Sequence, residues 1–399
     1  MTGARWRSPD AVLTESIIER VQRRLADRGQ APDPQALADA LRADSTVLSS
    51  DAQMLQLIRQ LQRELVGAGP LADLLADPAT TDVVVNGPAD VRVDRGAGWE
   101  PAPIRFADEA GVQRLARRLA TAAGRRLDDA HPHVDGRLVD GTRLHAVLAP
   151  IAASGTCLSL RVLRPARHDL AALAEAGSLP GCARAVVQAV LDARLAFLVS
   201  GGTGSGKTTL LSAMLAAVPE HERVVTVEDA EELRPPHPHL VRLVARQANV
   251  EGAGTISLRD LVRQALRMRP DRLVVGEVRG AEVVDLLAAL NTGHEGGAGT
   301  VHANTAGDVP ARLETLGALG GVGRAALHAQ LAGAVRVVLH VRRTGRHREL
   351  AEIAVLGRGA DGWVTAAPAV VAGRPVEPGG AQLASLLAER GQPSPWMVR

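Results

Sequence analysis

The chain has 399 residues, of which 46% are hydrophobic and 23% charged, as is typical of globular proteins with two or three domains and a sizeable core. A formal net charge of +2 gives no global sign of nucleic-acid binding, and four Trp, two Phe and no Tyr exclude an aromatic-rich core. No apolar run approaches the roughly 18 residues that span a bilayer, so we expect a cytoplasmic protein with no transmembrane segment or signal peptide and with reduced cysteines.

The first 67 residues predict a helical module. Apolar residues recur at helical spacing within 17–25 and again within 54–65, and Pro32 and Pro34 separate the two segments. The Gly- and Pro-rich run at 67–70 then indicates a domain boundary.

Residues 70–165 predict a mixed α+β domain. The expected helix covers 108–123, and the expected strands cover 81–86, 91–94, 143–148 and 158–163. Residues 165–169 are then expected to form the linker to the next domain.

Strands and helices alternate across 170–357, which is the pattern of a mostly parallel sheet covered by helices. The expected strands are 195–200, 223–227, 273–277, 299–302, 335–341 and 349–356. One expected helix begins at 207, and the others cover 258–268, 281–290, 308–318 and 324–333. Residues 358–399 are rich in Pro and Gly and are expected to form a loosely ordered tail.

A phosphate-binding loop (P-loop) follows the first strand of this second domain and opens a helix, the context that this motif requires. Its glycines let backbone N–H groups point at phosphates, and the start of the helix adds its dipole. We therefore expect ATP and Mg²⁺ as ligands, with Lys207 on the β- and γ-phosphates and Thr208 on the metal. The expected nucleotide-binding residues are Gly201, Gly202, Thr203, Gly204, Ser205, Gly206, Lys207, Thr208 and Thr209.

Of the 46 Lys and Arg residues, Lys207 is the one lysine. We interpret this as a drift of the sequence toward arginine wherever arginine serves. A compact ammonium on a flexible stem fits among phosphate oxygens better than a planar guanidinium does. The survival of lysine at this position favours a working site.

Two buried strands of this domain end in carboxylates. The run 272–277 ends at Glu277, which we expect to hold Mg²⁺ or polarise the attacking water. The usual Asp before this acid is replaced by Gly276, which leaves one acid for two roles. The strand over 224–228 supplies Glu228 as a second candidate to orient water, with Asp229 and Glu231 in support; a solvent-facing charged loop is the alternative.

His294 and His302 flank the expected strand 299–302. Their spacing does not suit a helical metal site and no third ligand is evident, so zinc is a weak reading. We expect both histidines to sense the γ-phosphate or to link it to neighbouring elements.

These motifs together resemble the ATPases of the type II/type IV secretion superfamily. The match is nearest to the CpaF/TadA-like branch, which serves tight-adherence (Flp) pilus assembly or conjugal-transfer-associated systems. The resemblance covers about residues 60–357. Four segments occur in the family's order: the P-loop at 201–208, an acidic box at 223–233, the Walker B strand at 273–280 and a His box at 292–304.

The resemblance implies a RecA-like P-loop ATPase domain after an α+β (PAS-like) domain and an N-terminal helical segment. It implies Glu277 as the main catalytic acid, assisted by Glu228, and Arg143 and Arg161 as arginines that reach the phosphates. It also implies a homo-hexamer that docks on inner-membrane platform proteins of a secretion or pilus system. Such a motor would be associated peripherally with the inner face of the cell membrane.

Three other classes of protein fit the residues less well. A nucleic-acid-translocating motor, as in conjugal DNA transfer, would need a basic groove with stacking aromatics, and six aromatics spread along the chain supply none. An ABC-type transporter subunit would need a Leu-Ser-Gly-Gly signature, which 263–271 lacks. A non-catalytic scaffold is disfavoured by the intact Lys207, Thr208 and Glu277.

Overall fold

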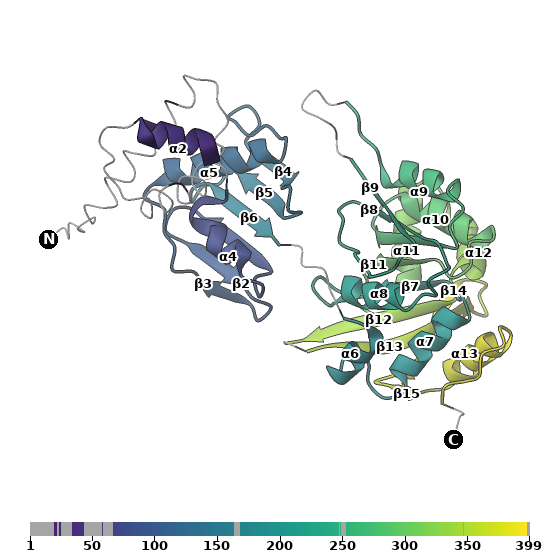
Figure 1. Ribbon diagram of the computed structural model, residues 1–399. Coiled ribbons are helices and arrows are strands. Elements are labelled where there is room, and N and C mark those ends of the chain that lie inside the picture. Colours follow the sequence, from purple (N-terminus) through teal and green to yellow (C-terminus); the bar gives the residue numbers. More distant parts are fainter. Residues whose placement is uncertain are drawn as a thin grey trace. The chain divides into compact units, whose positions relative to one another are not determined.

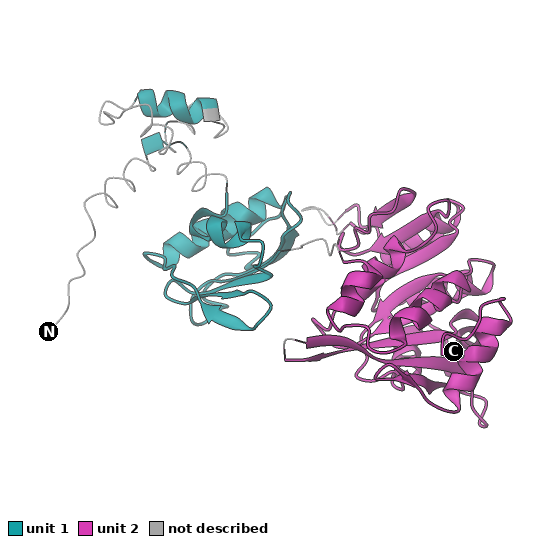
Figure 2. Ribbon diagram, turned by 60° about the horizontal axis from the view of Figure 1, so that its bottom comes forward, with its two compact units in different colours: residues 1–163 teal, residues 164–399 magenta. Residues whose placement is uncertain are grey.

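The computed structural model describes residues 20–21, 24, 34–43, 58, 67–162, 168–246, 248, 253–345 and 347–396. They divide into two compact units, residues 1–163 and 164–399 (Figure 2). The helical faces predicted within 17–25 and 54–65 lie almost entirely outside the described residues. Between them, helix α2 (Pro34–Arg42) begins at one of the prolines predicted to separate helices, because a helix needs no N–H donor from its first turn.

The first unit is built on a six-stranded antiparallel sheet with the order β3-β2-β1-β6-β5-β4 (Figure 1). Alternate residues of β1, β2, β5 and β6 are buried and pack against the apolar face of helix α5. The elements of this unit after α2 are η1 (Gly69–Leu71), α4 (Ala72–Ala76), β1 (Asp82–Asn86), β2 (Val91–Asp94), β3 (Trp99–Pro101), α5 (Glu109–Ala122), β4 (His133–Arg137), β5 (Arg143–Val147) and β6 (Cys157–Arg161).

The second unit is built on a nine-stranded sheet. Its helices are α6 (Leu170–Glu175), α7 (Ala183–Asp192), α8 (Lys207–Ala216), α9 (Leu258–Leu266), α10 (Glu282–Asn291), α11 (Val309–Leu319), α12 (Arg324–Ala334) and α13 (Gly379–Ala388). Its strands are β7 (Phe197–Ser200), β8 (Val224–Glu228), β9 (Leu240–Val244), β10 (Arg272–Val278), β11 (Ala298–Val301), β12 (Val337–Thr344), β13 (His347–Arg358), β14 (Val364–Val371) and β15 (Arg374–Pro375).

The strands β12-β7-β11-β10-β8-β9 are parallel neighbours in that order, and β13, β14 and β15 extend the sheet in antiparallel fashion. The P-loop strand β7 lies between β11 and β12, which both come later in the chain. This is the RecA-like arrangement, so the predicted α/β fold is confirmed. In open sheets of this kind, ligands bind beyond the carboxyl ends of the parallel strands.

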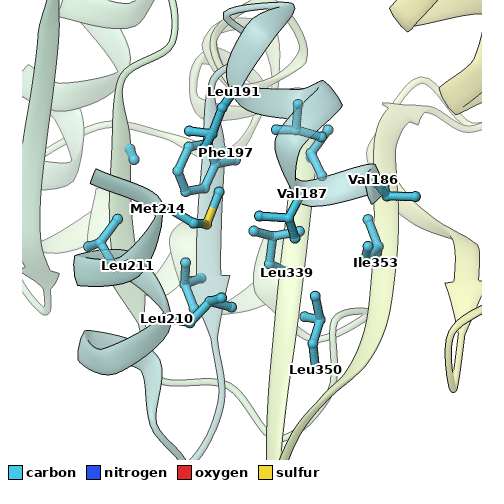
Figure 3. Close-up of a cluster of buried hydrophobic side chains, with 14 of the residues drawn as sticks. Val186, Val187, Leu191, Phe197, Leu210, Leu211, Met214, Leu339, Leu350 and Ile353 are labelled. Atoms are coloured by element: carbon cyan, nitrogen blue, oxygen red, sulfur yellow. The ribbon is translucent and has the colours of Figure 1, made fainter. Parts of the chain in front are cut away.

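Two apolar layers cover the faces of this sheet. Helices α6, α7, α8 and α13 pack on one face, and α9 to α12 pack on the other. On the first face, Phe197 of β7 lies between side chains of α7 and α8, and Leu339 and Ile353 continue the cluster onto β12 and β13 (Figure 3). Leu, Val and Ala make up most of both layers, as the shortage of aromatics required.

The expectation of a loosely ordered tail at 358–399 is wrong for the described part of it. Strand β14 continues the sheet, and helix α13 buries Leu383 and Leu387 completely against the first apolar layer. The abundant Gly and Pro lie largely in the turns around these elements, while the apolar residues keep strand and helix spacing. Among the described residues, no helix is long and apolar enough to cross a membrane.

Candidate active site

The parallel strands bring several predicted site residues to one edge of the sheet. The P-loop follows β7, Glu228 ends β8, Glu277 lies one residue before the end of β10, and His302 follows β11. These four segments are far apart in the sequence. They meet because neighbouring parallel strands all end at the same edge.

The P-loop adopts a backbone that only glycine accommodates easily. Gly204 has φ +68° and Gly206 has φ +101°, the left-handed region that a Cβ atom disfavours. A Cβ at Gly201 would lie 2.3 Å from the carbonyl oxygen of Val341 on β12. Helix α8 then starts at Lys207, so its first N–H groups, which have no partner one turn earlier, face the loop.

Three donors of the loop converge on one carbonyl oxygen. The Gly202 oxygen accepts from Ser205 N at 3.4 Å, from Ser205 Oγ at 2.9 Å and from Lys207 Nζ at 2.9 Å. Lys207 Nζ also donates to the Gly201 oxygen at 3.0 Å, and its residue is 8% exposed. Burial lowers the pKa of Lys207, against the opposing effect of the carboxylates of Glu277 and Glu232. Such a set of donors around one oxygen suits the oxygens of a phosphate chain.

His302 joins the P-loop lysine to the acid of β10. Its Nδ1 lies 3.4 Å from Lys207 Nζ and its Nε2 lies 3.0 Å from Glu277 Oε1. Burial and the charge of Lys207 lower the pKa of His302, while Glu277 acts in the opposite direction. The neutral ring therefore accepts from Lys207 at Nδ1 and donates to Glu277 from Nε2.

Glu277 also pairs with an arginine of its own strand end. Arg279 Nη2 lies 3.0 Å from Glu277 Oε2 and 3.0 Å from Asp229 Oδ2. Glu231, which was expected to support Glu228, instead pairs with Arg234 at 3.4 Å and with Arg242 of β9. Asp229 thus joins the Glu277 side of the site, and Glu231 faces the neighbouring edge strand.

Glu228 is a buried carboxylate that lies directly beside Gly276. Its Oε1 accepts from the backbone N–H groups of Glu232 at 3.1 Å and Leu233 at 3.0 Å. Burial raises the pKa of Glu228 to about 7, although these two hydrogen bonds act in the opposite direction. A Cβ at Gly276 would lie 2.6 Å from Glu228 Cγ, so the glycine leaves the room that the Glu228 side chain fills.

His294 lies away from the P-loop edge of the sheet, and its expected link to the γ-phosphate stays a prediction. It lies before β11, at the end of that strand opposite His302, and its Nδ1 is 3.2 Å from the carbonyl oxygen of Ala289. Because a strand separates the two histidines, they face opposite edges of the sheet. Within this chain, His294 therefore does not join Lys207 and Glu277.

Arg143 and Arg161 belong to the first unit and are direct cross-strand partners on β5 and β6. Arg161 Nε lies 3.3 Å from the carboxylate of Asp82 on β1. Their expected action on the phosphates stays a prediction.

A pocket of about 410 Å³ adjoins the P-loop and reveals residues that the sequence analysis did not single out. Its lining residues are Gly202, Thr203, Ser205, Asn304, His340, Val341, Arg342, Arg343 and Gly345. His340 is paired in register with Ser200, and its Nδ1 lies 3.0 Å from the Ser200 hydroxyl. The sequence does contain one pattern that could have indicated these lining residues. It is the basic run 342–348, which directly follows the apolar segment of the last parallel strand.

The residues present fit ATP better than a metal held by protein alone. The loop and Lys207 supply donors for phosphates, whereas the described residues contain no group of three or more His, Cys, Asp or Glu that could hold a metal ion. A magnesium ion here would need phosphate oxygens in addition to Thr208 and Glu277. That requirement matches the usual way in which Mg²⁺ binds with a nucleotide.

The chain is similar to known proteins of one family. Residues 64–354 match the family model described as "Type II/IV secretion system protein". The putative conjugal transfer protein MT3759 of Mycobacterium tuberculosis is 64% identical over 348 residues, which cover 85% of this chain and 98% of that protein. The probable conjugal transfer protein TrbB of Sinorhizobium fredii is 30% identical, covering 77% of this chain and 92% of that protein. The solved VirB11 ATPase of the Brucella suis type IV secretion system, in complex with sulphate, is 26% identical with a TM-score of 0.38, covering 71% of this chain and 94% of that one.

Proposed function

Because the chain belongs to the type II/IV secretion system protein family, we propose that it is a Mg²⁺-dependent ATPase that powers a secretion, pilus or conjugal-transfer system. The observation that carries this proposal is the contact chain Lys207–His302–Glu277 at the P-loop edge of the sheet. A phosphate-binding lysine, a neutral histidine and a carboxylate in contact form a set of groups suited to phosphoryl transfer to water.

Each side chain of this set has a separate role. The Lys207 ammonium, now held by the carbonyl oxygens of its own loop, binds phosphate oxygens of the substrate. Glu277 accepts a hydrogen bond from the attacking water and orients it. His302 holds the lysine and the carboxylate at a fixed separation, and Glu228 borders the same strand end from β8.

When bound, Mg²⁺ supplies positive charge that offsets the negative charge of the phosphates. Thr208, at the start of α8, and Glu277 are the residues that would hold it. The other P-loop residues, Gly201 to Gly206 and Thr209, would surround the phosphates with backbone and hydroxyl donors. Arg143 and Arg161 would add positive charge that stabilises the transition state.

The assembly proposed for this enzyme is a homo-hexamer at the inner face of the cell membrane, where ATP turnover drives membrane platform proteins of the system. The family membership supports this part. Phosphate release by the purified chain, with light scattering in the presence of nucleotide, tests it. A fully active monomer, or a protein that releases no phosphate, would contradict the proposal.

The specific system served stays open between two classes. A Tad/Flp pilus motor is favoured by the motif resemblance. A nucleic-acid-translocating motor is favoured by the printed name of the Mycobacterium tuberculosis relative, a putative conjugal transfer protein. Stimulation of phosphate release by single-stranded or duplex DNA would favour the second class, and indifference to DNA would favour the first.

A further inference from the structure

The β12–β13 hairpin packs against the P-loop. The part of it that contacts the loop, residues 341–345 and 347–348, is called the hairpin wall. Strand β12 pairs in parallel with β7 up to His340 and Ser200, then continues to Thr344 alongside the loop that follows β7 (Figure 1). The glycines of the loop touch this wall closely. A Cβ at Gly204 would lie 3.4 Å from Arg343 Nη1, and one at Gly206 would lie 3.3 Å from Arg348 Cδ.

Two arginines of the hairpin are directly opposite each other at this wall. Arg343 of β12 and Arg348 of β13 are cross-strand partners, so their side chains leave the same face of the hairpin. Both arginines lie close to Gly204. A Cβ on this glycine would meet Arg343 Nη1, and Arg348 donates a hydrogen bond to its carbonyl oxygen. A pair of guanidinium groups beside a phosphate-binding loop gains from a nearby anionic ligand.

Arg348 fixes one peptide group of the loop. Its Nε donates to the carbonyl oxygen of Gly204 at 3.1 Å. That oxygen and the N–H of Ser205 belong to one trans peptide group and point in opposite directions. Holding the Gly204 oxygen against the hairpin therefore keeps the Ser205 N–H on the other side, where it joins Lys207 Nζ at the Gly202 oxygen.

Because residue 204 is a glycine, the orientation of the peptide group that follows it depends on a contact from outside the loop. Gly204 has φ +68°, and a glycine rotates its adjoining peptide groups at little cost. Without the guanidinium, the 204–205 peptide group could turn its oxygen inward, where a carbonyl dipole would oppose phosphate oxygens. We propose that Arg348 is a positioning residue for nucleotide binding, which orients the Gly204–Ser205 peptide group so that its N–H faces the phosphates. This inference rests on the proposed ATPase function.

The test compares two arginines of the same strand. Arg348 and Arg358 each donate to a glycine carbonyl oxygen at 3.1 Å, but the partner of Arg358 is Gly362, in the turn before β14. Binding of a fluorescent ADP analogue with Mg²⁺ is measured for the wild type, Arg348→Met and Arg358→Met. Arg348→Met is expected to raise Kd by about 10-fold or more, since a hydrogen-bonding donor is misdirected, and Arg358→Met by less than about twofold.

Two further readouts separate positioning from a merely structural role. The N–H contact is made in the ground state and the transition state alike, so KM should rise while kcat at saturating ATP stays within about twofold. The melting temperature without nucleotide should stay close to that of Arg358→Met, because each variant loses one exposed hydrogen bond to a glycine carbonyl oxygen. Arg348→Lys keeps the charge but not the Nε donor, so it should bind as weakly as Arg348→Met.

The outcomes are distinct. Nucleotide affinity of Arg348→Met within about twofold of the wild type, wild-type affinity of Arg348→Lys, or an equal loss in Arg358→Met would each overturn the inference. A lower melting temperature without any loss of affinity would also overturn it. A wild-type chain that binds no nucleotide would instead contradict the proposed function itself.

Discussion

Glu228 of β8 and Gly276 of β10 share one space: a Cβ on the glycine would lie 2.6 Å from Glu228 Cγ, closer than such atoms approach. The two strands are parallel neighbours and are in register up to Val227 and Val275, one residue before this pair. The missing carboxylate before Glu277 is thus replaced in space by a carboxylate from the next strand.

Gly276→Ala should destabilise the protein by about 1–3 kcal/mol, because the new methyl group forces Glu228 or the strand to move. Denaturant unfolding measures this. Gly357→Ala, on β13, is the matched control, since a Cβ there meets nothing within 4 Å. Adding Glu228→Ala to Gly276→Ala should recover part of the loss, and strictly additive effects of the two substitutions would contradict the shared space.

Glu228→Gln should stabilise the protein at alkaline pH. Burial raises the pKa of Glu228 from its ordinary 4.5 to about 7, so its protonated form favours folding. That contribution is complete below about pH 4.5 and is lost as the pH rises through about 7. The Gln variant cannot ionise, so its advantage over the wild type should grow by up to about 3 kcal/mol between about pH 5 and about pH 8.

Unfolding by denaturant at the two pH values measures this difference. Glu175→Gln, an exposed position at the end of α6, makes the same chemical change without burial and should show no such growth. A Glu228→Gln advantage that is constant with pH, or that shrinks as the pH rises, would argue against a buried carboxyl of raised pKa.

His302→Gln should slow phosphate release by roughly 10- to 100-fold, because Gln keeps at most one of the two contacts to Lys207 and Glu277, and one contact to a charged group is worth about 1.5–3 kcal/mol. His294→Gln is the control, since that residue lies at the other end of β11. Because the pKa of His302 lies below its ordinary 6.5, wild-type activity should persist into mildly acidic solution. Equal losses in the two variants would contradict the assigned geometry.

Much of this site could be predicted from the sequence. The P-loop, the acids at 228 and 277 and the histidine at 302 each lie in a short segment at the end of a recognisable strand, and parallel strands bring such ends together. The placement of His294 could not be predicted in this way, because the strand between it and His302 places the two rings at opposite edges of the sheet.

The hairpin wall and the ordered tail could not be predicted in the same way. Val341, Arg343 and Arg348 reach the P-loop only because β12 pairs with β7, a contact between segments about 140 residues apart. No local pattern records that pairing. In the tail, Gly and Pro at the turns concealed the apolar spacing of Leu383 and Leu387, whose burial depends on the layer that they cover.

The packing of α13 on the sheet is itself testable. Leu383→Ala should cost about 2–5 kcal/mol of unfolding free energy, because this side chain is completely buried between α13 and the sheet. Gln382→Ala, the exposed neighbour on the same helix, should cost less than about 0.5 kcal/mol. Denaturant unfolding compares the two variants. Equal stabilities would mean that α13 does not pack on the sheet.

The most direct test of the central claim measures phosphate release and nucleotide binding together in Glu277→Gln. If Lys207, His302 and Glu277 form one ATP-hydrolysing site, phosphate release should fall by about 100-fold or more, since the water loses its orienting carboxylate. ADP binding should remain, because the P-loop and Lys207 are intact, and Lys207→Ala should lose both. Phosphate release by Glu277→Gln at the wild-type rate would contradict the account.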